Sequence, residues 1–156
     1  LVQIDVLYPD RDTERDILIA TTGAAEDTAH EVFSAAELIA AQGLLRRMPV
    51  GERVVDAILD LVRACRPGEA EAHDAVQGLV AWGPGPRAAQ ALMLTVRARA
   101  LLQGRLAPSL DDVAAMARPV LSHRMALGFA ARAQGADLGQ IIDTVAAQAT
   151  DMAAAA

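Results

Sequence analysis

The chain has 156 residues, 53% of them hydrophobic but only 3% aromatic, so it can bury an aliphatic core, and such a composition favours helices. Its 20 acidic and 14 basic residues give a net charge of −6, which argues against a general nucleic-acid-binding or acidic-membrane surface. Every basic residue is an arginine, and because a P-loop requires a lysine, this chain cannot supply one.

The N-terminal residues predict a strand followed by a short helix. Val2, Ile4 and Val6 alternate with polar residues, which is the pattern of a half-buried strand. Asp10 or Asp12 can cap the helix that follows. A lone strand has no partner for its backbone groups, so we expect it to pair with another segment, fray, or pair between chains.

Two helices are predicted next. Ser34 and Glu37 form a capping box that opens a helix ending at Pro49. The second helix covers residues 52–66, and its apolar side chains recur at i, i+3, i+4 and i+7. These inward side chains are Val55, Ile58, Leu59 and Val62.

The rest of the chain alternates between loops, short extended segments and helices. In order, we expect a loop over 69–77, an extended segment over 76–82, a helix over 86–103, a helix capped by Ser109, an extended segment over 127–131 and a final helix capped by Asp137. Ser109 and Asp112 repeat the capping-box pattern, and Pro119 predicts a bend. The alanine-rich residues 153–156 read as a frayed helix end or tail. The predicted fold is mainly α, a small helical bundle preceded by one strand.

A tight turn opens the long helix at residues 83–86. Its two glycines tolerate a positive φ, and Pro86 suits the first helical position because its missing N–H is not needed there. Arg87 is therefore held at a helix N-terminus, where free N–H groups and the helix dipole favour an anion such as phosphate. On this turn alone, a plain helix start with a solvated arginine remains the commoner structure.

Other candidate sites have simpler explanations. His30, His73 and His123 are far apart and lack metal-ligand spacing, so we expect no metal site. Cys65 lies in an apolar helix pattern and predicts a small core residue. His123 and Arg124 lie near a helix end, where capping and packing explain both.

Charged side chains elsewhere also favour structural roles. Asp111 and Asp112 lie in the first turn of a helix, where dipole stabilisation explains them better than acid–base catalysis. His73 has no nucleophile in a strained turn nearby, so we assign it no catalysis. Arg97 and Arg99 point away from the apolar face of their helix and are expected to be solvated.

The location of the protein is also suggested by the sequence. Cys65 is the only cysteine, so no internal disulfide can form and a reducing compartment fits. There is no signal peptide pattern and no apolar run long enough to span a bilayer. We expect a cytoplasmic protein, and the absence of an initiator methionine at Leu1 suggests a piece of a longer one.

Several motifs together resemble the MoxR family of AAA+ ATPases. The run Gly83-Pro84-Gly85-Pro86-Arg87-Ala88 is similar to the family's sensor 2 motif. Four further stretches occur in the family's order: Tyr8-Pro9-Asp10, Pro49-Val50-Gly51, Ala107-Pro108-Ser109-Leu110-Asp111-Asp112-Val113 and Pro119-Val120-Leu121-Ser122-His123-Arg124. Many relatives have Ala and Ser where this chain has Pro84 and Gly85, but glycine is a nearly equivalent N-cap. The similarity runs from Val2 to about Ala147.

The resemblance implies a division of the chain and a nucleotide site. Residues 1–8 would be the last strand of the ATPase core, 9–149 the helical lid, and 150–156 a tail. Arg87 would reach the γ-phosphate of ATP. Tyr8 and Pro9 would lie at the hinge that borders the adenine, with Ile17 as a further apolar contact, although Tyr8 and Pro9 also fit an ordinary turn.

The resemblance further implies ATP and Mg²⁺ as cofactors of a full-length parent that forms a homo-oligomeric ring, usually a hexamer. Such a parent acts as a chaperone-like machine that matures other proteins, often with partners that carry a von Willebrand factor A domain. We expect no cofactor, no ATP hydrolysis and no tight ATP binding from this chain alone.

An alternative of a different class is an all-α scaffold that binds partners through an apolar groove and binds no nucleotide. A helical nucleic-acid binder is disfavoured by the acidic charge balance. A P-loop and an acidic Walker B strand upstream would favour the ATPase over the scaffold.

Overall fold

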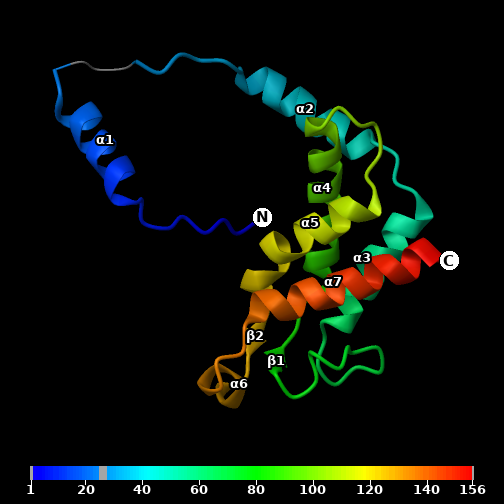
Figure 1. Cartoon of the computed structure of the whole chain (residues 1–156). Helices are drawn as coiled ribbons and strands as arrows, with labels where there is room; N and C mark the ends of the chain where they lie inside the picture. Colours follow the sequence, from blue (N-terminus) through cyan, green and yellow to red (C-terminus); the bar gives the residue numbers. More distant parts are fainter. Residues whose placement is uncertain (1, 25–27, 156) are drawn as a thin grey trace.

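The computed structural model describes residues 2–24 and 28–155, which fold mainly into helices as predicted (Figure 1). In chain order the elements are α1 (Arg11–Thr22), α2 (Ala35–Arg47), α3 (Glu52–Ala64), β1 (Val80–Trp82), α4 (Pro86–Leu102), α5 (Leu110–Leu121), the 3-10 helix η1 (Ser122–Arg124), β2 (Ala126–Leu127), α6 (Phe129–Ala133) and α7 (Leu138–Ala155).

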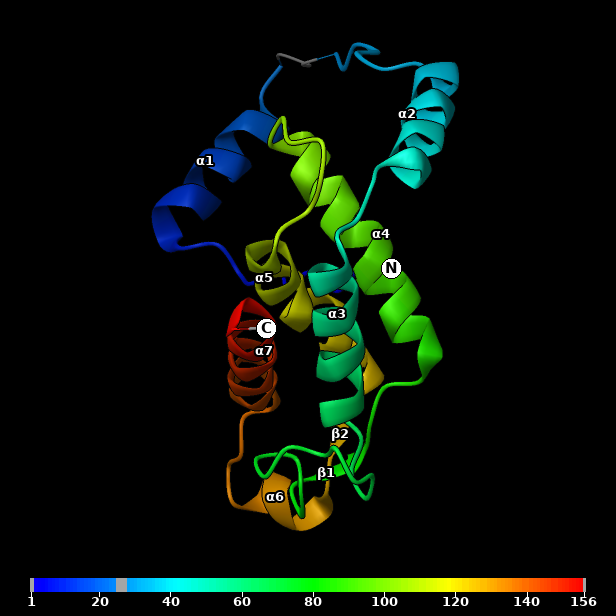
Figure 2. The same cartoon turned by 90° about the vertical axis from the view of Figure 1, so that its right-hand side faces the viewer.

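A bundle of α3, α4, α5 and α7 encloses one aliphatic core. The helix α7 packs on α3 and α5, and α4 packs on α5 and α3 (Figures 1 and 2). The largest fully buried apolar side chains are Ile58, Leu61, Leu92, Leu121 and Ile142. Each such side chain contributes about 1.5–3 kcal/mol on burial. The predicted inward position of Leu59 is wrong, because this side chain faces a groove and stays 47% exposed.

Local capping signals set the helix boundaries. Asp10 is the cap of α1, since its carboxylate accepts a hydrogen bond from the Thr13 N–H at 2.8 Å. Ser34 and Ser109 each form the predicted capping box at α2 and α5. Pro119 lies inside α5, which continues for two residues before the chain tightens into η1.

A two-stranded antiparallel sheet closes the lower end of the bundle. Val80 pairs with Leu127, and the Gly128 N–H donates to the Leu79 carbonyl at 2.7 Å. The extended segment predicted over 127–131 is wrong from Phe129 onward, where α6 begins. Gly128 is extended but serves as the N-cap of α6, where its carbonyl accepts from the Arg132 N–H.

The N-terminal arm, residues 2–24, extends away from the bundle (Figure 1). Residues 2–9 lie outside both described strands, and α1 buries none of its side chains. The Gln3 N–H donates to the Pro119 carbonyl at 2.7 Å, which ties the arm to α5. The predicted strand therefore forms no ladder with β1 or β2 among the described residues.

The C-terminal helix is longer than expected. Residues 150–155, expected to belong to a tail, continue α7, and Ala153 is only 6% exposed. Leu1 and Ala156 lie outside the described residues. None of the described helices combines the length and apolarity that a membrane span requires.

Candidate functional site

The turn at residues 83–86 leads directly into α4, as predicted. Pro86 occupies the first helical position, and Gly85 is the N-cap with extended backbone angles of φ −81° and ψ −179°. Because glycine has no side chain, no side-chain oxygen caps the first turn of α4. The first turn also holds no acidic residue. This helix end therefore keeps its partial positive charge without a local counter-charge.

Arg87 lies at the second position of this helix and is exposed. Its neighbour Ala88 is fully buried, as is Leu92 one turn later, so Arg87 lies on the side of α4 away from the core. Within the described residues it makes no side-chain hydrogen bond or ion pair. A cation at a helix N-terminus is electrostatically unfavourable, because the helix dipole is positive there. An anion bound here would be attracted by both the Arg87 guanidinium and the helix N-terminus, and it would offset the repulsion between them.

The end of α3 fixes the same turn from behind. A Cβ added to Gly83 would lie 2.4 Å from the Cys65 carbonyl oxygen and 2.8 Å from the Arg66 Cα, so no other residue fits without backbone movement. The Arg66 Nε donates to the Pro84 carbonyl at 3.0 Å, and Pro84 is itself buried. The sequence predicted the turn but missed Arg66, because the contact spans 18 residues and has no local signal.

The residues predicted to face a purine lie elsewhere in this structure. Tyr8 is fully exposed and Ile17 is 49% exposed, and both belong with Pro9 to the N-terminal arm. Figures 1 and 2 place α1 away from the end of α4 that carries Arg87. The structure thus does not bring Tyr8, Pro9 and Ile17 together with Arg87, and their roles stay predictions.

An apolar groove of about 580 Å³ begins within one turn of Arg87. It lies between the end of α2, the middle of α3 and the first half of α4. Its lining residues are Arg46, Val55, Ile58, Leu59, Ala89, Gln90, Met93 and Leu94. The apolar periodicity predicted Leu59 in the core, so the position of this groove was not predicted.

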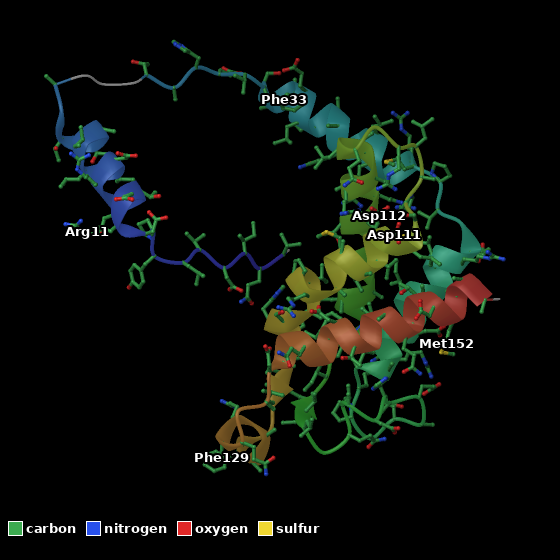
Figure 3. The ribbon with its side chains drawn as sticks, in the orientation of Figure 1. Arg11, Phe33, Asp111, Asp112, Phe129 and Met152 are labelled. Carbon is green, nitrogen blue, oxygen red and sulfur yellow. The ribbon has the colours of Figure 1, made fainter. Side chains whose placement is uncertain are left out.

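Asp112 is fully buried at the start of α5, beside the exposed Asp111 (Figure 3). Its carboxylate accepts from Arg105, Arg99 and the Ser109 N–H. Burial alone would raise the pKa of Asp112, but hydrogen bonds from Arg105, Ser109 and Arg99 outweigh it and hold that pKa well below its usual range. The dipole role predicted for Asp112 fits this place, whereas the prediction of a solvated Arg99 is wrong.

The remaining candidates have structural roles. The Arg124 guanidinium donates to the Val120 carbonyl and contacts the His123 ring, as the capping interpretation predicts. Burial and the nearby Arg124 charge lower the pKa of His123. Burial raises the pKa of the Cys65 thiol to about 12, which makes it a poor nucleophile. Among the described residues, no group of three or more candidate side chains could hold a metal ion.

Known proteins are similar to this chain in sequence and in fold. A sequence model described as the AAA lid domain matches residues 72–145, which include the turn and Arg87. The chaperone MoxR1 of Mycobacterium tuberculosis is 30% identical over 150 residues, covering 94% of this chain and 40% of MoxR1. The chain carries the lid domain of a MoxR-type AAA+ protein.

A solved structure agrees with the fold of this lid. A candidate ATPase from Cytophaga hutchinsonii superposes with a TM-score of 0.83 at 24% identity, over 92% of this chain and 44% of that one. The chain therefore spans less than half the length of either relative.

Proposed function

We propose that this lid belongs to a longer ATPase and that Arg87 is its sensor 2 arginine, contacting the γ-phosphate of ATP. The observation that carries the proposal is the exposed Arg87 at the uncapped N-terminus of α4, without an anionic partner in the described residues. A guanidinium there neutralises charge on the phosphoryl oxygens.

Under this proposal, ATP binds with Mg²⁺ between an ATPase core and the lid. The chain has no lysine, so the P-loop must come from the core. Hydrolysis removes the γ-phosphate, Arg87 loses its contact, and the lid is free to rotate against the core. The hinge residues Tyr8 and Pro9, with Ile17, are proposed to contact the adenine once the core is present.

The proposal extends to the assembly. We propose a cytoplasmic homo-oligomeric ring, usually hexameric, that matures or activates other proteins. Partners with a von Willebrand factor A domain are proposed on the same basis. Similarity to a chaperone of the MoxR type supports this part of the proposal.

The test is the ATPase rate of the longer protein with Arg87→Ala. We expect turnover to fall about tenfold or more, which corresponds to about 1.4 kcal/mol of transition-state stabilisation. Arg53→Ala is the matched control, since Arg53 is also exposed and follows Glu52 at the second position of α3, behind a glycine N-cap. An unchanged rate in a folded Arg87→Ala variant would make Arg87 a structural helix start.

The chain alone gives a second test. Without a P-loop it should neither hydrolyse ATP nor bind it tightly. Isothermal titration calorimetry with ATP and Mg²⁺ should show no binding at micromolar concentrations. Micromolar affinity would contradict the proposal that the ATPase core supplies the main nucleotide contacts.

A second candidate function is supported by the apolar groove beside α3 and α4. Leu59 is 47% exposed on its edge, and Met93 and Leu94 line it. Such a groove suits the apolar face of a partner helix, as a scaffold that binds no nucleotide requires. A longer protein without any ATPase activity would give this candidate the lead.

A further inference from the structure

Two helices that are separate in the sequence meet at the turn before Arg87. The chain leaves α3 at Cys65, and Cys65 is fully buried in the core. Gly83 packs directly against the backbone of Cys65 and Arg66. The turn is thus in van der Waals contact with the end of a helix that the core holds rigidly.

The guanidinium of Arg66 adds a directional contact to this packing. Its Nε donates to the Pro84 carbonyl at 3.0 Å in a half-buried setting. The backbone of Arg66 is also held, because its backbone N–H donates to the Arg63 carbonyl at 3.0 Å. A hydrogen bond from a charged donor is stronger than one between neutral groups.

In the described part of the chain, no side chain caps the start of α4. The N-cap is Gly85, which has no side chain that could accept hydrogen bonds from the first N–H groups of the helix. At α2 and α5, a serine at the N-cap position and an acidic residue three positions later perform this task. At α4 no such acceptor is present. The Arg66 guanidinium instead reaches across from α3 and holds the Pro84 carbonyl, one residue before the N-cap.

We propose that Arg66 is a positioning residue for Arg87. Its guanidinium holds the Pro84 carbonyl, fixes the turn at residues 83–86, and so sets the position from which Arg87 is presented to a phosphate. This proposal rests on the proposed sensor role of Arg87. Small displacements of a charge-stabilising group have large effects on rate, so loosening the turn should impair catalysis although Arg66 touches no substrate.

The test is a double-mutant cycle on the ATPase activity of the longer protein. Arg66→Ala should lower kcat about tenfold with a smaller change in KM for ATP. Arg66→Lys keeps a charged donor for the Pro84 carbonyl and should restore most of kcat. The double variant Arg66→Ala/Arg87→Ala should be no slower than Arg87→Ala, because both substitutions act on the same contact between Arg87 and phosphate.

The matched control is Arg63→Ala, one turn earlier on the same helix. Arg63 pairs with Glu71, and both side chains are about half exposed, so its loss should leave kcat unchanged. An unchanged kcat in Arg66→Ala overturns the proposal, and so does an additive double variant.

A second readout does not depend on nucleotide. Amide hydrogen exchange in peptides covering residues 83–90 should be faster in Arg66→Ala than in the wild type, while peptides from α7 should not change. Equal exchange at the turn overturns the proposal. An unchanged rate in Arg87→Ala overturns the proposed function instead, and the exchange result still decides whether Arg66 fixes the turn.

Discussion

Arg105 donates two hydrogen bonds, each 2.7 Å long, to the buried carboxylate of Asp112. The pair joins the loop after α4 to the first turn of α5, and Arg99 adds a contact from α4 itself. Since Asp112 has no exposed surface, its charge depends on these two arginines and on the Ser109 N–H.

Replacing Asp112 with asparagine should therefore destabilise the lid. Both arginines are about one-third exposed, so water can recover part of their solvation and we expect a loss of about 2–4 kcal/mol. Urea unfolding followed by circular dichroism measures it. Asp111→Asn is the matched control, because Asp111 is exposed in the same turn and should cost no more than about 1 kcal/mol. Equal losses in the two variants would contradict a role for the buried pair.

The same carboxylate predicts a dependence of stability on pH. The hydrogen bonds depress the folded-state pKa of Asp112 despite its burial, so its contribution is present above the unfolded-state value of about 3.9 and is lost as pH falls toward the folded-state value. Unfolding free energies measured from pH 7 down to pH 3 should fall less steeply in Asp112→Asn than in the wild type. Parallel curves would assign the acid sensitivity to other groups.

Alanine at Gly83 should disrupt the turn before α4. The added Cβ would meet the backbone of Cys65 and Arg66, which cannot rotate away, so we expect a loss of about 1–3 kcal/mol. Gly85→Ser is the contrasting variant, because Gly85 has open space and extended backbone, and serine should gain a few tenths of a kcal/mol. Thermal melts of both variants decide the matter, and a neutral Gly83→Ala would refute the close packing.

Cys65 should resist thiol reagents in the folded lid. It is fully buried, and burial raises its pKa to about 12, so little thiolate forms at pH 8. Ellman's reagent should react slowly in native buffer. It should react completely in about 8 M urea, which unfolds most small domains. Fast reaction of the native protein would show that α3 opens locally.

The helices were predictable because their signals are local. The spacing of Ile58 and Val62, and capping pairs such as Ser34 with Glu37, lie within one or two turns of sequence. Gly85 and Pro86 likewise marked the start of α4. Local periodicity and capping chemistry determine such features before tertiary contacts form.

The contacts around the candidate site were not predictable in the same way. Arg66 reaches Pro84, and Arg99 reaches Asp112, only because the bundle brings separate helices together. The α6 start at Phe129 was missed because a glycine weakens a helix interior, whereas Gly128 is the N-cap of α6. A single sequence carries no period or spacing that pairs these positions.

The packing of α7 against α3 has a consequence for biosynthesis. These two helices contact each other extensively, yet α4, α5 and both strands separate them along the chain. During translation α3 emerges early with Ile58, Leu61 and Val62 uncovered, and its cover arrives only when Ile142 and Val145 leave the ribosome. The lid therefore acquires its complete core only after α7 is synthesised, and until then the nascent chain presents an apolar helix face of the kind that cellular folding factors bind.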